Sequence, residues 1–312
     1  MFVHVRHVTR YSYSKAVFCE PMTVRLYPRH DAGQHVHSYQ LQLLPTPAGM
    51  SSGLDLHDNN SAKLWFQGLT SNLIITSDAV VETLRTNPYD FLLDRGASHL
   101  PHQTSGPLEP LFDYYTRPEG DSPGVRALAE EVLAETERQT IGFICRLADR
   151  IYHECETVIR DQGMSLPAEE TWQSRRGACR DQAVLFNEAC RAVGLPARFV
   201  SGYSLSALED HEERHLHAWS EVYLPGAGWR GFDPTTGLAV ADEHVAVATG
   251  RLPHHAAPTH GTFRGTEATS TIETQIVLRH IPNPPANGPH KAATLDLSTA
   301  AMTARMSQPM PR

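Results

Sequence analysis

The sequence lacks any excess of basic residues. Its 27 Lys and Arg residues are outnumbered by 35 Asp and Glu residues, and its formal net charge is −8. Proteins that bind nucleic acid concentrate Lys and Arg to follow the phosphates, so the charge balance argues against such a partner. The chain also contains no apolar run of the roughly 18 residues that a membrane-spanning helix needs. We therefore expect neither nucleic acid nor membrane as a partner.

Cysteines are few, and their number and spacing do not suggest pairs. The chain has five cysteines, an odd number, and no C-x-x-C pair, which argues against a disulfide framework and against a zinc ribbon. The opening segment MFVHVRHVTRYSYS has no charged start, apolar run or small-residue cleavage site of a secretory signal. Free thiols are typical of reducing compartments, so we expect a cytoplasmic location.

Polarity patterns divide the chain into three parts. Residues 1–90 alternate between apolar and polar residues in short runs separated by turn residues, which predicts an N-terminal β-sandwich-like domain. Residues 91–281 begin with a Pro- and Gly-containing connection of little regular structure and continue with helix and strand patterns. Residues 282–312 are rich in Pro, Ala, Ser and Thr, which predicts a disordered tail. The expected fold class is α+β.

Cys179 is the first residue of a predicted helix. The helical pattern extends to about residue 193, where Gly194 and Pro196 end it. A helix N-terminus has unpaired N–H groups and partial positive charge. Such a position lowers the pKa of a thiol and can stabilise an oxyanion. The alternative is a small core cysteine at a helix start, and Cys190, deeper on the same face, is expected to be of that kind.

His217 and Asp233 lie in two adjoining strand patterns, HAWSEVYL and WRGFD. If residues 224–228 form a five-residue loop, Tyr223 pairs with Trp229, and His217 becomes a diagonal neighbour of Asp233 on the same face. A four-residue loop would turn Asp233 to the opposite face. Taken singly, the two residues could be a half-buried structural histidine and a strand-ending turn.

With Cys179, these two residues make up a nucleophile, a base and a group that orients the base. The surrounding motifs resemble the bacterial transglutaminase-like superfamily, which groups transglutaminases with related cysteine peptidases. The resemblance rests on G-x-C-R-D at residues 177–181, G-L-P-A-R-x-V-S-G-Y at 194–203, H-A-W-x-E-V-Y at 217–223 and G-W-x-G-F-D-P at 228–234. Residues 241–251 and the N-terminal β region are similar to the family as well.

The resemblance implies a papain-like core, with the cysteine helix packed on an antiparallel sheet, and acyl transfer through a thioester. Cys179 would be the nucleophile, His217 its base and Asp233 the orienting group. Members of this bacterial group are more often described as proteases, so we expect hydrolysis of a protein or peptide amide. Transglutaminase activity with an amine acceptor is the alternative. No cofactor or metal is implied, and the acidic loop of a calcium site is absent.

Two rival interpretations come from other classes. Residues His211 to His215 match H-E-x-x-H, the signature of a zinc peptidase. Zinc binding by this motif requires a helix that places both histidines on one face, whereas the short, charged context here predicts a loop. The second rival is a binding module without catalysis. The intact Cys179, His217 and Asp233 argue against it.

Overall fold

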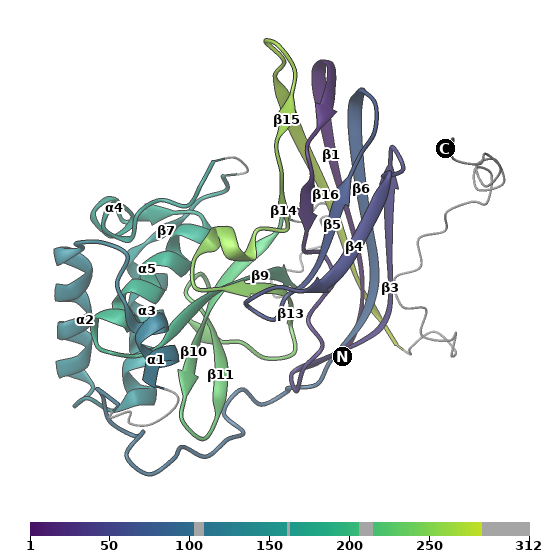
Figure 1. The fold of residues 1–312 in the computed structure, drawn as a ribbon. Helices are drawn as coiled ribbons and strands as arrows, with labels where there is room; N and C mark the ends of the chain where they lie inside the picture. The colour runs from purple at the N-terminus through teal and green to yellow at the C-terminus, as the bar shows by residue number, and fades with distance from the viewer. Residues whose placement is uncertain (103–108, 161–162, 206–214, 283–312) are drawn as a thin grey trace, which may run out of the picture.

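The structure is a computed structural model and describes residues 1–102, 109–160, 163–205 and 215–282. It has the predicted mixed α+β architecture with antiparallel sheets. The helices gather on one side, a central sheet lies beside them, and long strands of the N-terminal region form the opposite side (Figure 1). None of the described helices combines the length and apolar character needed to cross a membrane.

The N-terminal region contains two antiparallel sheets. The larger one consists of β15 (Phe263–Arg264), β1 (Phe2–Cys19), β6 (Thr70–Thr83) and β3 (Gln34–Leu44), and β16 (Ser270–Ile281) also pairs with β1. The smaller one has the order β14 (Thr259–His260), β2 (Met22–Val24), β5 (Asn60–Trp65) and β4 (Gly49–Leu54). Both contain the alternating apolar positions that the sequence predicts.

Strand β1 joins two hydrophobic cores. Near its start, Val3 and Val5 pack with Tyr203 of the central sheet. Near its end, Val17 packs with Leu64 between the two N-terminal sheets. Because alternate residues of a strand point to the same face, one apolar face of β1 serves both contacts. The N-terminal region is thereby packed directly against the central sheet.

Some strand pairs join residues on the two sides of the proposed domain division. Residues 259–281 were grouped with the second domain, but β14 pairs with β2, and β15 and β16 pair with β1. The pairing of Phe2 with Ile281 shows how the end of the described chain returns to its beginning. Local sequence patterns predict a strand but not its partner, so this pairing could not be predicted from the sequence. The boundary near residue 90 stays a prediction, and residues 283–312 lie outside the described residues.

The central sheet and the helices pack against each other as two layers. The sheet has the order β12 (Leu238–Ala239), β11 (Gly228–Asp233), β10 (His217–Leu224), β9 (Ala197–Ser204) and β13 (His244–Gly250). The helices are α1 (Glu109–Thr116), α2 (Pro123–Glu135), α3 (Thr140–Glu154), α4 (Ala168–Ser174) and α5 (Cys179–Ala192), followed by the short 3₁₀ helix η1 (Pro253–Ala256). Two-residue strands β7 (Glu156–Thr157) and β8 (Arg176–Gly177) pair in parallel just before α5.

Helix α5 lies at the centre of the contact between the helices and the central sheet. It packs on β9 and β10 and is surrounded by α2, α3 and α4. Its inner face includes Phe186, stacked on Phe232 of β11 at 6.3 Å, and Cys190, which is completely buried. The predicted helix and the buried position of Cys190 are both confirmed. Gly194 follows the helix at φ +77°, a conformation that favours glycine.

Candidate active site

Cys179 begins helix α5. Ala178 is the N-cap residue, and the carboxylate of Asp181 accepts a hydrogen bond from the Ala178 N–H at 2.8 Å. This contact holds the chain just before Cys179 in place. The N–H groups at the start of a helix have no carbonyl partner inside the helix. Cys179 is half-buried, whereas Cys19, Cys155 and Cys190 are buried. The thiol therefore lies at the positive end of the helix dipole and at the edge of the core.

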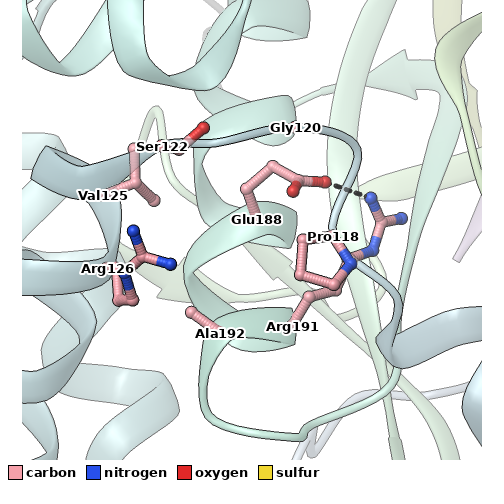
Figure 2. Close-up of a pocket in the computed structure, with 8 residues that line it drawn as sticks. All are labelled: Pro118, Gly120, Ser122, Val125, Arg126, Glu188, Arg191 and Ala192. Carbon is pink, nitrogen blue, oxygen red and sulfur yellow. Dashed lines mark hydrogen bonds and ion pairs between the residues drawn. The ribbon is translucent and has the colours of Figure 1, made fainter.

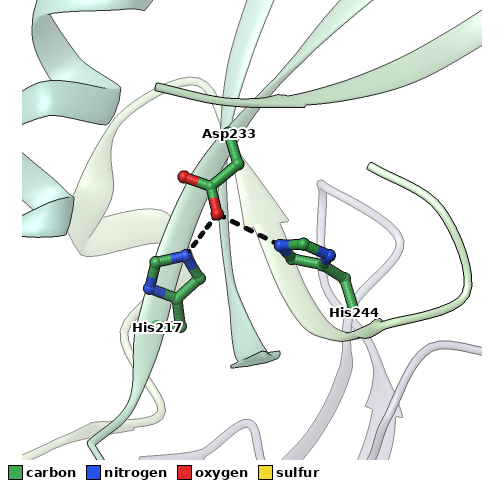
Figure 3. A group of neighbouring side chains, drawn as sticks. All are labelled: His217, Asp233 and His244. Carbon is green, nitrogen blue, oxygen red and sulfur yellow. Dashed lines mark hydrogen bonds and ion pairs between the residues drawn. The ribbon is translucent and has the colours of Figure 1, made fainter. Parts of the chain in front are cut away.

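His217 and Asp233 meet across the hairpin formed by β10 and β11. Tyr223 pairs with Trp229, so the predicted register is confirmed. The pairing continues to Leu224 and Gly228, so the loop is shorter than the five residues expected. Continuing that register places Asp233 level with Trp219, and His217 lies diagonally beside it. Nε2 of His217 is 2.6 Å from Oδ2 of Asp233. The two side chains form a short, charge-assisted hydrogen bond (Figure 3).

The imidazole of His217 also contacts the nucleophile candidate. Burial disfavours its charged form, but the hydrogen bond and charge of Asp233, together with a hydrogen bond to Cys179, raise the pKa of His217 to about 10. An ionised carboxylate only accepts hydrogen bonds, so the His217 proton facing Asp233 is on Nε2. The remaining ring nitrogen, Nδ1, is therefore the one available to the thiol. The structure thus brings together the three residues that the sequence analysis singled out.

Asp233 is almost fully buried and hydrogen-bonded on both oxygens. Burial alone would raise its pKa, but His217 and His244 lower it below the usual range of an aspartate. Oδ1 accepts hydrogen bonds from the Thr235 N–H at 2.9 Å and the Thr235 hydroxyl at 2.7 Å. Oδ2 accepts from both His217 and His244, the latter at 3.1 Å. The carboxylate is therefore ionised and fixed in orientation.

His244 was not among the predicted site residues. It is the first residue of β13, far from the hairpin in sheet order, and in the sequence it is one of 18 histidines. The only available signal was the likeness of residues 241–251 to the family, which assigned no role to this side chain. Its contact with Asp233 depends on how β13 pairs with β9, and a local pattern does not encode that pairing.

The same three side chains have a composition that suits a metal ion. The ligand atoms of His217, Asp233 and His244 lie within 4.8 Å of one another. However, two imidazole N–H groups already point at Asp233 Oδ2, and the carboxylate needs no cation to be satisfied. We interpret the group as a hydrogen-bonded network. As for the rival zinc motif, His211 lies outside the described residues, and His215 is exposed.

Two family models match separate parts of the chain. Residues 3–82 match the model of the bacterial transglutaminase-like N-terminal region, and residues 126–234 match that of the transglutaminase-like superfamily. An uncharacterized protein of Mycobacterium tuberculosis is 27% identical over 287 residues, covering 87% of this chain and 90% of that protein. A protein-glutamine gamma-glutamyltransferase of Pseudomonas aeruginosa is 31% identical over 133 residues, covering 40% of this chain and 20% of that protein.

A solved structure shares the fold over nearly the whole chain. The crystal structure of a candidate cysteine protease from Cytophaga hutchinsonii has a TM-score of 0.67 and 20% sequence identity, and the match covers 93% of this chain and 94% of that chain. The similarity therefore includes both the N-terminal sheets and the core that contains Cys179.

Proposed function

Because the chain belongs to the transglutaminase-like superfamily and carries the bacterial N-terminal region of that family, we propose that it is a cysteine-dependent acyl-transfer enzyme acting on protein or peptide amides. The observation that carries the proposal is the short hydrogen bond between His217 and the buried Asp233, made by an imidazole whose pKa Cys179 also helps to raise. Cys179 is the proposed nucleophile, His217 the general base and acid, and Asp233 the group that orients and charges His217.

The first half-reaction forms a thioester. Nδ1 of His217 takes the thiol proton, and the Cys179 sulfur attacks the carbonyl carbon of the amide. The N–H groups at the start of α5 stabilise the developing oxyanion. The imidazolium then donates its proton to the leaving nitrogen, and the C–N bond breaks. The high pKa of His217 keeps this proton on the imidazolium until the nitrogen leaves.

The second half-reaction releases the acyl group. Water gives a proton to His217 and attacks the thioester carbonyl, and the thiolate leaves and recovers the proton from the imidazolium. The product is a carboxylic acid, and the enzyme acts as a peptidase or amidase. We favour this hydrolytic outcome.

The five unpaired cysteines support the cytoplasm as the proposed location of the protein, because free thiols persist in reducing compartments.

Transfer to an amine is the second candidate. The region shared with the Pseudomonas glutamyltransferase, 133 residues at 31% identity, favours a glutamine side chain as acyl donor and a lysine-like amine as acceptor. The chemistry up to the thioester is the same. Only the acceptor that reaches it differs.

Selective alkylation tests the proposed nucleophile. The native protein is treated briefly with iodoacetamide near neutral pH, and modification of each cysteine is quantified by mass spectrometry. We expect Cys179 to react at least about tenfold faster than Cys145, which is also half-buried and provides an internal control. His217→Ala should remove this advantage. Equal modification of Cys179 and Cys145 in the wild type would contradict the proposal.

The acceptor is identified in a separate assay. Casein is incubated with the protein, with and without the fluorescent amine dansylcadaverine, and the products are examined by mass spectrometry. Hydrolysis predicts new carboxylates, either as cleaved peptides or as deamidated glutamines. Transfer predicts incorporation of the amine. Cys179→Ala should abolish both, and activity that persists in this variant would point to another site.

A further inference from the structure

His244 makes a contact that the proposed reaction does not require. Its Nε2 is 3.1 Å from Oδ2 of Asp233, the same oxygen that accepts the hydrogen bond of His217. Figure 3 shows the two imidazoles approaching the carboxylate from opposite sides. We propose that His244 is a positioning residue: it fixes Asp233 and limits the pull of this carboxylate on the proton of His217. The inference deepens the proposed function and rests on it.

Within the part of the chain that the structure describes, the side chain of His244 makes no hydrogen bond other than the one to Asp233. Its side chain is 7% exposed, and its Nδ1 is buried without a hydrogen-bond partner among the described residues. The ring packs edge-on against Trp219, with centroids 5.1 Å apart. Since an ionised carboxylate donates nothing, His244 must present its Nε2 proton to Asp233. One donated hydrogen bond is therefore the polar role of this side chain.

The backbone around His244 is shaped to bring it there. Strand β13 is shifted against β9 by a bulge between Ala246 and Ala248. At Gly202 of β9, an added Cβ would lie 2.2 Å from the Val245 carbonyl oxygen and 2.6 Å from the Trp219 ring. Bulges bend and re-aim a strand, and glycine allows the close approach. Both features let the start of β13 and Trp219 lie beside the carboxylate.

His244 affects the protonation of His217 because both imidazoles bind the same oxygen, Oδ2 of Asp233. Among the described residues, the titratable groups that face His217 are Asp233 from β11, Cys179 from α5 and His244 from β13. Strand β9 contributes Gly202 opposite His217. A second N–H on Oδ2 draws negative charge from the oxygen that binds His217. Thr235 holds only Oδ1, so His244 is the group that fixes Oδ2 independently of His217.

Two substitutions separate this role from mere packing. His244→Gln keeps an N–H donor where Nε2 stands, and His244→Leu fills similar space without a donor. In the full-length protein labelled with ¹⁵N-histidine, the titration of His217 is followed by NMR and assigned with His217→Gln. We expect His244→Leu to move this titration about 0.5–1 pH unit upward, because the full charge of Oδ2 then acts on His217. His244→Gln should leave it near the wild-type position.

The casein assay provides a second measurement. His244→Leu should slow Cys179-dependent turnover about 10–100-fold, the scale expected when a catalytic group loses its alignment, and His244→Gln should restore it to within about threefold of wild type. Equal behaviour of the two variants, or an unmoved His217 titration in His244→Leu, would overturn the inference. If the wild type lacks a reactive Cys179, the proposed function fails instead, and the NMR titration still decides the role of His244.

Discussion

Arg160 donates two hydrogen bonds, at 2.6 and 2.8 Å, from one guanidinium nitrogen to the two oxygens of Asp181. Asp181 is completely buried in the first turn of the cysteine helix. Its oxygens also accept hydrogen bonds from the N–H groups of Ala178 and Leu166, both at 2.8 Å. One carboxylate thus ties the segment before α4 and the residue before Cys179 to the start of α5.

Replacing this carboxylate should destabilise the protein and loosen the nucleophile. In Asp181→Ala the buried N–H of Ala178 loses its acceptor and Arg160 loses its ion pair with this carboxylate, at a cost of about 3 kcal/mol in the free energy of unfolding. Urea unfolding measures the change. Asp121→Ala is the matched control, because its ion pair with Arg126 is exposed and should contribute less than about 1 kcal/mol. A similar loss in both variants would contradict this assignment.

The charge on Asp233 should determine the protonation of His217. In Asp233→Asn the hydrogen-bonding shape is kept but the charge is lost, so the pKa of His217 should fall from about 10 toward the ordinary value near 6.5. The thiolate–imidazolium pair then becomes less populated at neutral pH. We expect iodoacetamide alkylation of Cys179 at pH 7 to slow at least about tenfold, since each pKa unit is a factor of ten.

His217 titration by ¹⁵N NMR accompanies this measurement. As a control, Asp78→Asn removes a partly exposed carboxylate that pairs with His4 at the far N-terminal sheet, and it should change neither the alkylation rate nor the His217 titration. An unchanged His217 titration in Asp233→Asn would show that the carboxylate does not govern the base.

The fold could be anticipated where the information is local. Helix α5 ends at Ala192, next to Gly194, because an apolar stripe and a glycine stop are both visible within the segment. The β10–β11 hairpin has its predicted register because loop length fixes which residues face each other. His217 and Asp233 could therefore be placed on one face from the sequence alone.

Other features depend on partners distant in the chain. The pairing of β1 with β16 joins residues about as far apart as Phe2 and Ile281, and no local pattern specifies it. Helix α1 (Glu109–Thr116) lies within a stretch expected to have little regular structure; its buried Phe112 packs edge-on against Tyr223 at 5.4 Å. Cys145 of α3 is half-buried, with its sulfur 3.3 Å from the hydroxyl of Tyr89, a contact between segments that no local pattern specifies.

Stability should depend on pH through the Asp233–His217 pair. The pKa of Asp233 is lowered, so its contribution is present above the ordinary carboxylate pKa and is lost in acid. The pKa of His217 is raised to about 10, so its contribution is complete below the ordinary histidine pKa and disappears as the pH rises through about 10. Both statements describe one pair, and its contribution is about 1.5–3 kcal/mol.

Unfolding in urea at several pH values tests this dependence. The difference in unfolding free energy between wild type and His217→Gln should be greatest near pH 5–6 and should shrink toward pH 10. His153→Gln, which alters an exposed histidine on α3, serves as the control and should show no comparable trend above pH 7. A difference for His217→Gln that stays constant up to pH 10 would mean that the pair does not stabilise the folded state.

Gly202 connects the packing of the sheet to the proposed site. An added Cβ would lie within 2.2 Å of the Val245 carbonyl and 2.6 Å of Trp219, and neither backbone nor a buried ring can yield easily. Gly202→Ala should therefore lower the free energy of unfolding by about 1–3 kcal/mol or more. It should also push β13 outward, so that His244 withdraws from Asp233 and Cys179-dependent turnover falls.

Gly53→Ala is the matched control, because Gly53 also lies in a strand and nothing approaches its Cβ position within 4 Å. Its unfolding free energy and turnover should stay near those of wild type. If Gly202→Ala lowers stability while leaving both turnover and the His217 titration unchanged, the close approach of β13 serves the fold alone. If turnover falls and the His217 titration moves to higher pH, as expected for His244→Leu, then the close packing of β13 on Gly202 also keeps Asp233 aligned with His217.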